Sequence, residues 1–305
     1  MTGRERAWAK LNLSLDVTGR RPDGYHELVM VMASVTLWDD VEVTLREDGR
    51  IRADCGLPWL PGDERNLAVK AARAFFAALG RPELGADIRI RKRIPVGAGM
   101  AGGSSDAAAV LRCLNRMTGA GWTADRLRKL GLELGSDVPY CVSGGMALAR
   151  GRGELLTPLP PLPEACRVVI CKPRFSLSTA ELFGRVDSRT GRIHPDTEGL
   201  VSALEAGDLA GLARRMFNVF EEVLPRTCRE VGEIRRALID LGALGAVMTG
   251  TGSAVFGVFD GEETAAQARR RLGKRYRDCF LAKAVPEMEE TAYGKEPAET
   301  PGGDQ

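Results

Sequence analysis

A glycine-rich stretch beside a run of helix-forming residues constrains this chain more than any other feature. It reads RIPVGAGMAGGSSDAAAV over residues 93–110, with glycine at four of the seven positions 97–103. Glycine adopts backbone angles that other residues avoid and lets a ligand approach the main chain closely, whereas residues 107–111 favour helix. The pattern predicts a loop of free N–H groups that leads into the positive end of a helix, an arrangement suited to phosphate.

Three polar residues separate the glycines from the alanines: Ser104, Ser105 and Asp106. Residues of this kind cap helix N-termini, so we expect a capped helix over roughly 104–117. A tight turn before a helix is the simpler alternative. The density of glycines favours phosphate binding over it.

The glycine spacing alone does not identify the type of phosphate loop. Gly97, Gly99 and Gly102 match the dinucleotide-binding pattern GxGxxG, but that site needs an acidic residue at the end of a second strand about 20 residues further on. The acid near that distance, Asp125, lies in a predicted helix. A Walker loop would need Gly-Lys-Ser/Thr, and a protein-kinase loop would be followed by a strand carrying Val-Ala-Ile-Lys. The stretch therefore predicts a phosphate loop of another fold.

Length, charge and cysteine usage exclude several classes of protein. The chain has 305 residues, enough for two domains, and a net charge of +2, too small to suggest a nucleic-acid surface. Its 7 cysteines never occur in CxxC spacing, and the histidines are His26 and His194. These facts argue against a disulfide framework or a metal centre and favour a reducing cytoplasm. We expect no membrane span and no signal peptide.

Hydrophobic periodicity predicts an α+β protein of two domains. Residues 7–17 alternate as a half-buried strand, and further strands are expected over 28–37 and 40–48. Helices are expected at 66–79, 104–117 and 123–134, and later at 178–185, 198–205, 208–221, 227–241 and 262–273. A proline-rich stretch at 156–165 predicts a linker. The expected domains are residues 1–157 and 158–290, followed by a disordered tail at 291–305.

Candidate chemical groups lie near the predicted loops. Lys10 and Asn12 share the polar face of the first strand, and a solvated strand face is the simpler interpretation of both. Tyr25 and His26 offer an aromatic ring beside a hydrogen-bonding ring, and such a pair can bind a nucleobase. The alternative is a tyrosine of the core beside a histidine of the surface.

Asp137 precedes Val138-Pro139, and proline favours extended backbone in its predecessor Val138, so we expect Asp137 in or near the mouth of a loop. If it meets Lys10 across a phosphate, the pair suits phosphoryl transfer, in which a carboxylate takes a hydroxyl proton. The stretch MTGTGSAVFG at 248–257 is either a hairpin turn or a second wall of an anion site.

Four motifs together resemble the GHMP small-molecule kinases. They are AWAKLNLSLDV, RRPDGYHELVMVM, IPVGAGMAGGSSDAAAVL and VMTGTGSAVFG, in order over residues 7 to 285. The combination of DGYHEL and AKLNL narrows the resemblance to the branch that phosphorylates a methylerythritol carrying a cytidine diphosphate group, in the non-mevalonate route to isoprenoid precursors. The resemblance implies an N-terminal α+β domain, a ferredoxin-like C-terminal domain and an active site in the cleft between them.

The resemblance also implies roles for individual residues. Lys10 and Asp137 correspond to catalytic residues. The residues that correspond to substrate contacts are Asn12, Tyr25, His26, Thr179, Phe183, Gly250, Gly252 and Ser253. Those that correspond to ATP contacts are Asn66, Lys92, Pro95, Gly97, Ala98, Gly99, Met100, Ala101, Gly102, Gly103, Ser104 and Ser105. The implied cofactors are ATP as phosphoryl donor and Mg²⁺ carried with it, and the expected assembly is a monomer or homodimer without nucleic acid or membrane.

Two other functions remain open at this point. Another GHMP kinase, acting on homoserine, mevalonate or a sugar, would have no use for the base-binding residues in GYHEL. A non-catalytic nucleotide-binding regulator would not need both Lys10 and Asp137. The glycine loop departs from the family pattern at Met100, usually leucine, and at Ala101, often glycine. If position 101 needs a positive φ, alanine is strained there.

Overall fold

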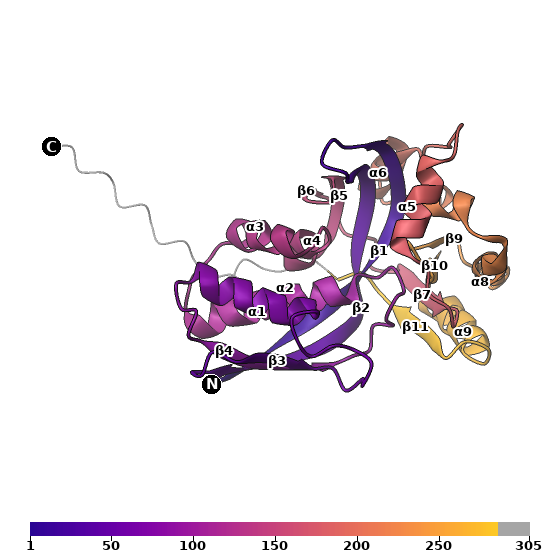
Figure 1. Ribbon diagram of the computed structural model, residues 1–305. Helices are drawn as coiled ribbons and strands as arrows, with labels where there is room; N and C mark the ends of the chain where they lie inside the picture. Colours follow the sequence, from indigo (N-terminus) through magenta and orange to yellow (C-terminus); the bar gives the residue numbers. More distant parts are fainter. Residues whose placement is uncertain (286–305) are drawn as a thin grey trace.

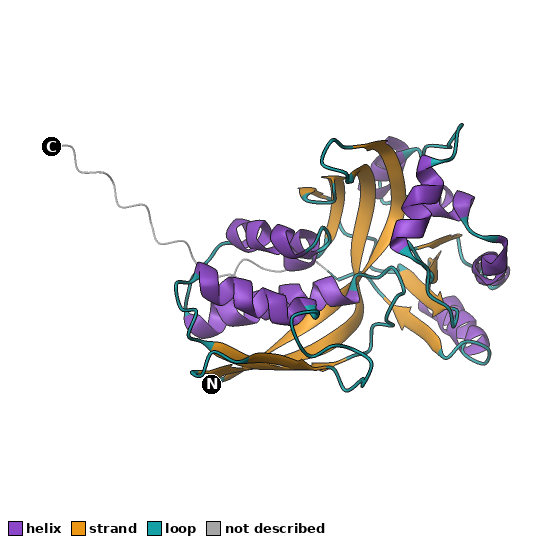
Figure 2. Ribbon diagram, viewed as in Figure 1, coloured by secondary structure: helices purple, strands orange, loops and turns teal. Residues whose placement is uncertain are grey.

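The computed structural model describes residues 1–285, and the expected tail at 291–305 lies outside them. A large mixed sheet has the strand order β3-β4-β2-β1-β8, with β5 paired to β2 and β6 paired to β5. Figures 1 and 2 show α1 and α2 lying along one side of this sheet. The elements of the first half are β1 (Thr2–Arg20), β2 (His26–Arg46), β3 (Ile51–Asp54), α1 (Leu67–Ala78), β4 (Gly85–Arg91), α2 (Gly102–Thr118), α3 (Ala124–Leu134), α4 (Val138–Ser143), β5 (Met146–Gly151) and β6 (Leu155–Pro158).

Strand β2 is one continuous strand where the sequence predicts two. It pairs with β1 in antiparallel register from Thr44 opposite Thr2 to His26 opposite Arg20. The register shifts between Trp8, which lies opposite Trp38, and Ala9, which lies opposite Val35. Beyond the shift, β2 exchanges β5 for β4 as its second neighbour. The bulge bends the strand without ending it.

Helix α2 brings the glycine loop onto the sheet. Ala107, Ala108 and Ala109 are fully buried, and such small side chains let the helix approach closely. The expected cap is wrong, because the helix begins at Gly102 and its N-cap is Ala101, which has no side-chain cap bond. The Ser105 hydroxyl instead donates to the Trp8 carbonyl oxygen of β1, at 2.6 Å.

The second half forms a four-stranded antiparallel sheet of order β11-β7-β10-β9. Counted along the chain this is the order 4-1-3-2 with helices between strands one and two and between three and four, the ferredoxin-like pattern. The expected fold class is thereby confirmed. The elements of the second half of the chain are β7 (Arg167–Lys172), α5 (Thr179–Asp187), α6 (Thr197–Glu205), α7 (Leu209–Arg214), β8 (Phe217–Asn218), η1 (Val219–Val223), η2 (Arg226–Cys228), α8 (Arg229–Asp240), β9 (Gly245–Met248), β10 (Val255–Phe259), α9 (Glu262–Leu272) and β11 (Asp278–Ala282).

The two halves share backbone contacts. The helix expected over 208–221 is wrong beyond Arg214, since β8 follows there and pairs in parallel with β1 of the large sheet. The Asn218 amide donates to the carbonyl oxygens of Met248 and Gly250, at 2.7 and 2.8 Å. Across the described residues no helix is long and apolar enough to cross a membrane.

Candidate active site

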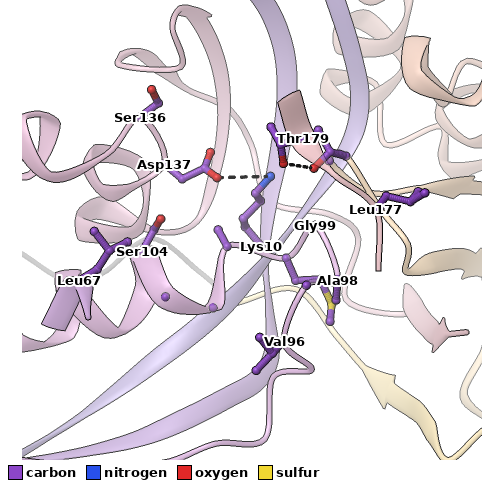
Figure 3. A pocket seen from close by; sticks show the side chains of 18 of the residues that line it. Lys10, Leu67, Val96, Ala98, Gly99, Ser104, Ser136, Asp137, Leu177 and Thr179 are labelled. Atoms are coloured by element: carbon purple, nitrogen blue, oxygen red, sulfur yellow. Dashed lines mark hydrogen bonds and ion pairs between the residues drawn. The ribbon is translucent and has the colours of Figure 1, made fainter. Parts of the chain in front are cut away.

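A cavity of about 910 Å³ lies between the two halves of the chain. Its walls come from the turn between β1 and β2, the loop before α1, the glycine loop, the start of α4, the start of α5 and the loop after β9. Figure 3 shows Lys10, Asp137, Ser104 and the backbone of the glycine loop around one part of this space. The fold thus brings together most of the candidate residues that the sequence places far apart.

The glycine loop lines the cavity with its main chain. Gly97 and Gly99 have φ angles of +64° and +76°, and Ala101 has φ +55°, the single positive φ of a non-glycine residue within 1–285. The strain foreseen for alanine at this position is therefore present. Residues 95–104 all line the cavity, whereas Ser105 is buried and faces β1. The backbone of the loop and the N-terminus of α2 together suit an anion.

Lys10 and Asp137 point toward each other across the cavity (Figure 3). The distance from Lys10 Nζ to Asp137 Oδ2 is 4.0 Å, and the exposed fractions of the two side chains are 5% and 36%. Lys10 also donates to Asn12 Oδ1 at 2.6 Å. Asn12 is fully buried and lies outside the cavity lining, so its amide holds the lysine rather than facing the open space.

The local backbone before Pro139 differs from the sequence prediction. Val138 is the first residue of α4 rather than extended, and Asp137 forms the N-cap of this helix with φ −83° and ψ −14°. The prediction fails because Pro139 lies in the first turn of that helix, where its missing N–H costs no hydrogen bond. A turn still contains the carboxylate and leaves it open to the cavity.

The second glycine loop forms the facing wall. Gly250, Thr251 and Gly252 line the cavity, and the Thr251 hydroxyl lies 2.9 Å from that of Thr179. Ser253 is fully buried and donates to the Phe175 carbonyl oxygen, so its hydroxyl faces away from the open space.

Aromatic rings gather at the end of the cavity near the β1–β2 turn. Tyr25 is 49% exposed, and the Arg152 guanidinium lies 3.8 Å from its ring centroid. The His26 ring stacks on Phe183 with centroids 4.4 Å apart. His26 Nε2 lies 2.8 Å from Asp187 Oδ1. No local pattern in the sequence points to Arg152 or Asp187, because their partners are distant along the chain.

Asn66 and Lys92 line the cavity, but both have partners within the protein. The Asn66 amide accepts from the Ala68 N–H and donates to the Pro61 carbonyl oxygen. Lys92 Nζ lies 2.6 Å from Asp39 and 2.7 Å from Asp106. Burial raises the pKa of the Asp106 carboxyl, the Asp39 charge adds to this, and Lys92 opposes both.

Comparison with known proteins identifies the family. Residues 66–145 match the model of the GHMP kinases N terminal domain, and residues 200–278 match GHMP kinases C terminal. The chain is 41% identical over 280 residues to a 4-diphosphocytidyl-2-C-methyl-D-erythritol kinase of Clostridium botulinum, covering 92% of this chain and 99% of the relative. The chain belongs to the GHMP kinase family.

Other proteins similar to this GHMP kinase support the same family assignment. A kinase of the same name from Brevibacillus brevis is 42% identical over 284 residues, covering 93% of this chain and 97% of the relative. A crystal structure of a 4-(cytidine 5'-diphospho)-2C-methyl-D-erythritol kinase superposes with a TM-score of 0.77 at 34% identity, over 92% of this chain and 98% of that one. A homoserine kinase from Cytophaga hutchinsonii, at 20% identity and a TM-score of 0.74, shares the fold over 95% of this chain and 96% of its own.

Proposed function

We propose that this GHMP kinase transfers the γ-phosphoryl group of ATP to the 2-hydroxyl of 4-diphosphocytidyl-2-C-methyl-D-erythritol, a step of the non-mevalonate route to isoprenoid precursors. Relatives that carry this kinase name match nearly the full length of the chain at 41% and 42% identity. The observation that carries the proposal is the juxtaposition of Lys10 and Asp137 between the glycine loop and the aromatic end of one cavity.

The residues divide the work by position. Backbone N–H groups of the glycine loop, at the N-terminus of α2, hold the phosphates of ATP. The acceptor hydroxyl lies beside Asp137, which takes its proton as the oxygen attacks the γ-phosphorus and ADP leaves with the bridging electron pair. The Lys10 ammonium group, which donates a hydrogen bond to Asn12 Oδ1 at 2.6 Å, stabilises the negative charge on the attacking oxygen and the transferred group.

Mg²⁺ fits this site as an ion that arrives with the nucleotide. No cluster of three His, Cys, Asp or Glu residues that could hold a metal ion by itself occurs in the described residues. The carboxylates that line the cavity are Asp106, which Lys92 engages, and Asp137, which is partly exposed. Mg²⁺ usually takes one or two carboxylates plus phosphates and water. Because Asp137 is the proposed base and Lys92 engages Asp106, the phosphates of ATP and water would supply its ligands here. When bound, the ion neutralises phosphate charge.

The cytidine end of the substrate belongs at the aromatic end of the cavity. Tyr25 is exposed enough to stack on a base, and His26 and Phe183, which stack on each other, line the same cavity. Homoserine and mevalonate carry no base, so these rings favour the cytidyl substrate over the acceptors of other kinases with this fold.

The test is turnover by the purified protein with ATP, Mg²⁺ and 4-diphosphocytidyl-2-C-methyl-D-erythritol, followed as ADP release. Parallel reactions contain homoserine, mevalonate or galactose. We expect turnover with the cytidyl substrate alone. Turnover with another alcohol would contradict the proposed substrate but would still show that the protein is a kinase. ATP binding without turnover on any acceptor would favour a regulator.

A further inference from the structure

His26 is fixed in place from two directions. Its ring stacks on Phe183, with centroids 4.4 Å apart and an interplanar angle of 24°. Phe183 in turn packs edge-to-face on Phe220, with centroids 4.9 Å apart. At the ring edge, Nε2 lies 2.8 Å from Asp187 Oδ1 at the end of α5. Because its face and one edge are both held, the ring presents its remaining edge in a fixed direction.

The contact with Asp187 determines the hydrogen on His26. An ionised carboxylate only accepts hydrogen bonds, so Nε2 must carry the hydrogen and donate it. In the neutral ring the other nitrogen, Nδ1, is then an acceptor. Nδ1 has no hydrogen-bond partner among residues 1–285, and His26 lines the cavity. The site thus contains one oriented acceptor without a protein donor.

We propose that Asp187 is a positioning residue that sets the base preference of the kinase. By holding the Nε2 hydrogen, it leaves Nδ1 free to accept from the exocyclic amino group of cytosine. Uracil has a carbonyl oxygen at that position, and two acceptors facing each other leave both unpaired. The inference rests on the proposed function, because it deepens the account of the cytidine end of the substrate.

The tautomer is measurable on the protein alone, because the chain has 2 histidines. Nitrogen-15 NMR of the imidazole rings distinguishes a hydrogen on Nε2 from one on Nδ1, and a His194→Gln variant assigns the His26 signals. We expect the hydrogen of His26 on Nε2, and we expect Asp187→Ala to give a mixture of tautomers. A hydrogen on Nδ1 in the wild type, alone or together with one on Nε2, would overturn the proposal.

Base preference is measured with CDP and UDP as probes, by calorimetry on the wild-type chain, Asp187→Ala and Glu181→Ala. Glu181 also lies on α5 but pairs with Arg185 and leaves His26 untouched, so it is the matched control. We expect the wild type and the control to prefer CDP, and Asp187→Ala to lose about tenfold of that preference. An unchanged preference in Asp187→Ala, or an equal loss in the control, would contradict the proposal.

Kinetics separate positioning from a general structural role. Asp187→Ala is expected to raise the KM of the cytidyl substrate about tenfold while kcat and the KM of ATP stay within about twofold. In a His26→Ala background the same change should have no further effect, since the two residues act as a pair. A parallel rise in the KM of ATP would indicate that Asp187 only supports the fold.

The two proposals fail in different ways. A wild-type chain that prefers CDP over UDP but does not phosphorylate the cytidyl substrate would contradict the proposed function and keep this inference. Turnover of the cytidyl substrate by the wild-type chain, together with an unchanged base preference in Asp187→Ala, would support the proposed function and contradict the role of Asp187.

Discussion

The backbone of Gly99 packs directly against the backbone of Thr249, so closely that a Cβ atom on Gly99 would overlap the Thr249 carbonyl oxygen. The two residues stand 150 positions apart, one in each glycine loop. The Ala254 N–H donates to the Ala98 carbonyl oxygen across the same junction, at 3.2 Å. The two loops therefore form one unit, and the cavity depends on this junction between the halves.

Gly99→Ala should lower the free energy of unfolding by at least about 2 kcal/mol, because the residue has φ +76° and no room for a Cβ atom. Chemical denaturation followed by circular dichroism measures the change. Gly232→Ala is the matched control, since Gly232 lies within α8 with nothing within 4 Å of an added Cβ. The control should be stabilised by up to about 1 kcal/mol. Equal unfolding midpoints for the two variants would show that the junction tolerates a side chain.

Ala101→Gly should stabilise the chain. Alanine at φ +55° costs about 1–2 kcal/mol, while glycine adds about 0.5–1 kcal/mol of unfolded-state entropy, so the net gain is about 0–1.5 kcal/mol. Ala107→Gly, within the buried part of α2, is the control in the same helix, and it should lower the free energy of unfolding. Urea unfolding of both variants is the measurement. A loss of stability in Ala101→Gly would mean that the left-handed backbone at this position is not strained.

Asp106→Asn should change how stability depends on pH. The pKa of Asp106 is raised in the folded state, so its contribution is present below the unfolded pKa of about 4 and is lost as the pH rises through the folded value of about 8. Asparagine does not ionise. The free energy of unfolding of the variant, relative to the wild type, should therefore increase between pH 4 and pH 8.

Asp48→Asn gives the control of opposite sign for this measurement. Arg46 lowers the pKa of the exposed Asp48 carboxyl, so its contribution is present above the unfolded pKa and is lost as the pH falls. The stability of that variant relative to the wild type should decline as the pH rises through the unfolded pKa. A flat difference for Asp106→Asn over the whole range would contradict the raised pKa.

Tyr25→Ala should weaken use of the cytidyl substrate far more than use of ATP. Stacking of a base on an aromatic ring contributes about 1–3 kcal/mol, so the KM of the substrate should rise about 5- to 150-fold. The Arg152 guanidinium already covers one face of the ring at 3.8 Å, and Tyr25→Phe keeps that contact as the control. Steady-state kinetics with each substrate varied in turn measures both constants. Equal losses for the two substrates would argue against stacking.

Local sequence patterns predict the elements that carry the site. The alternation in residues 7–17 places Lys10 and Asn12 on one face of β1, and the glycine loop follows from residue type alone. Patterns of this kind predict backbone better than the direction of single side chains. Ser105 and Ser253 belong to the predicted loops, yet their hydroxyls bond to Trp8 and Phe175 within the protein.

Local sequence patterns do not predict contacts between residues that are far apart in the chain. Asp187 and His26 are 161 positions apart, and no periodicity or motif relates them. The continuity of β2 depends in the same way on its exchange of neighbours from β5 to β4, which only the folded sheet specifies. The family resemblance supplied the functional pairing of Lys10 with Asp137, and the fold places the two within 4.0 Å.

Asp137→Asn should lower kcat by about 10²- to 10⁴-fold, because asparagine cannot take the proton of the acceptor hydroxyl. The KM of ATP should change little, because the proposed contacts of its phosphates are backbone N–H groups of the glycine loop. Ser136→Ala removes a neighbouring polar group that also lines the cavity and should keep its activity. Rapid-quench measurement of a single turnover separates the chemical step from product release. A variant that keeps the wild-type rate of that step would assign proton transfer to another group, and Lys10 would then be the first residue to replace.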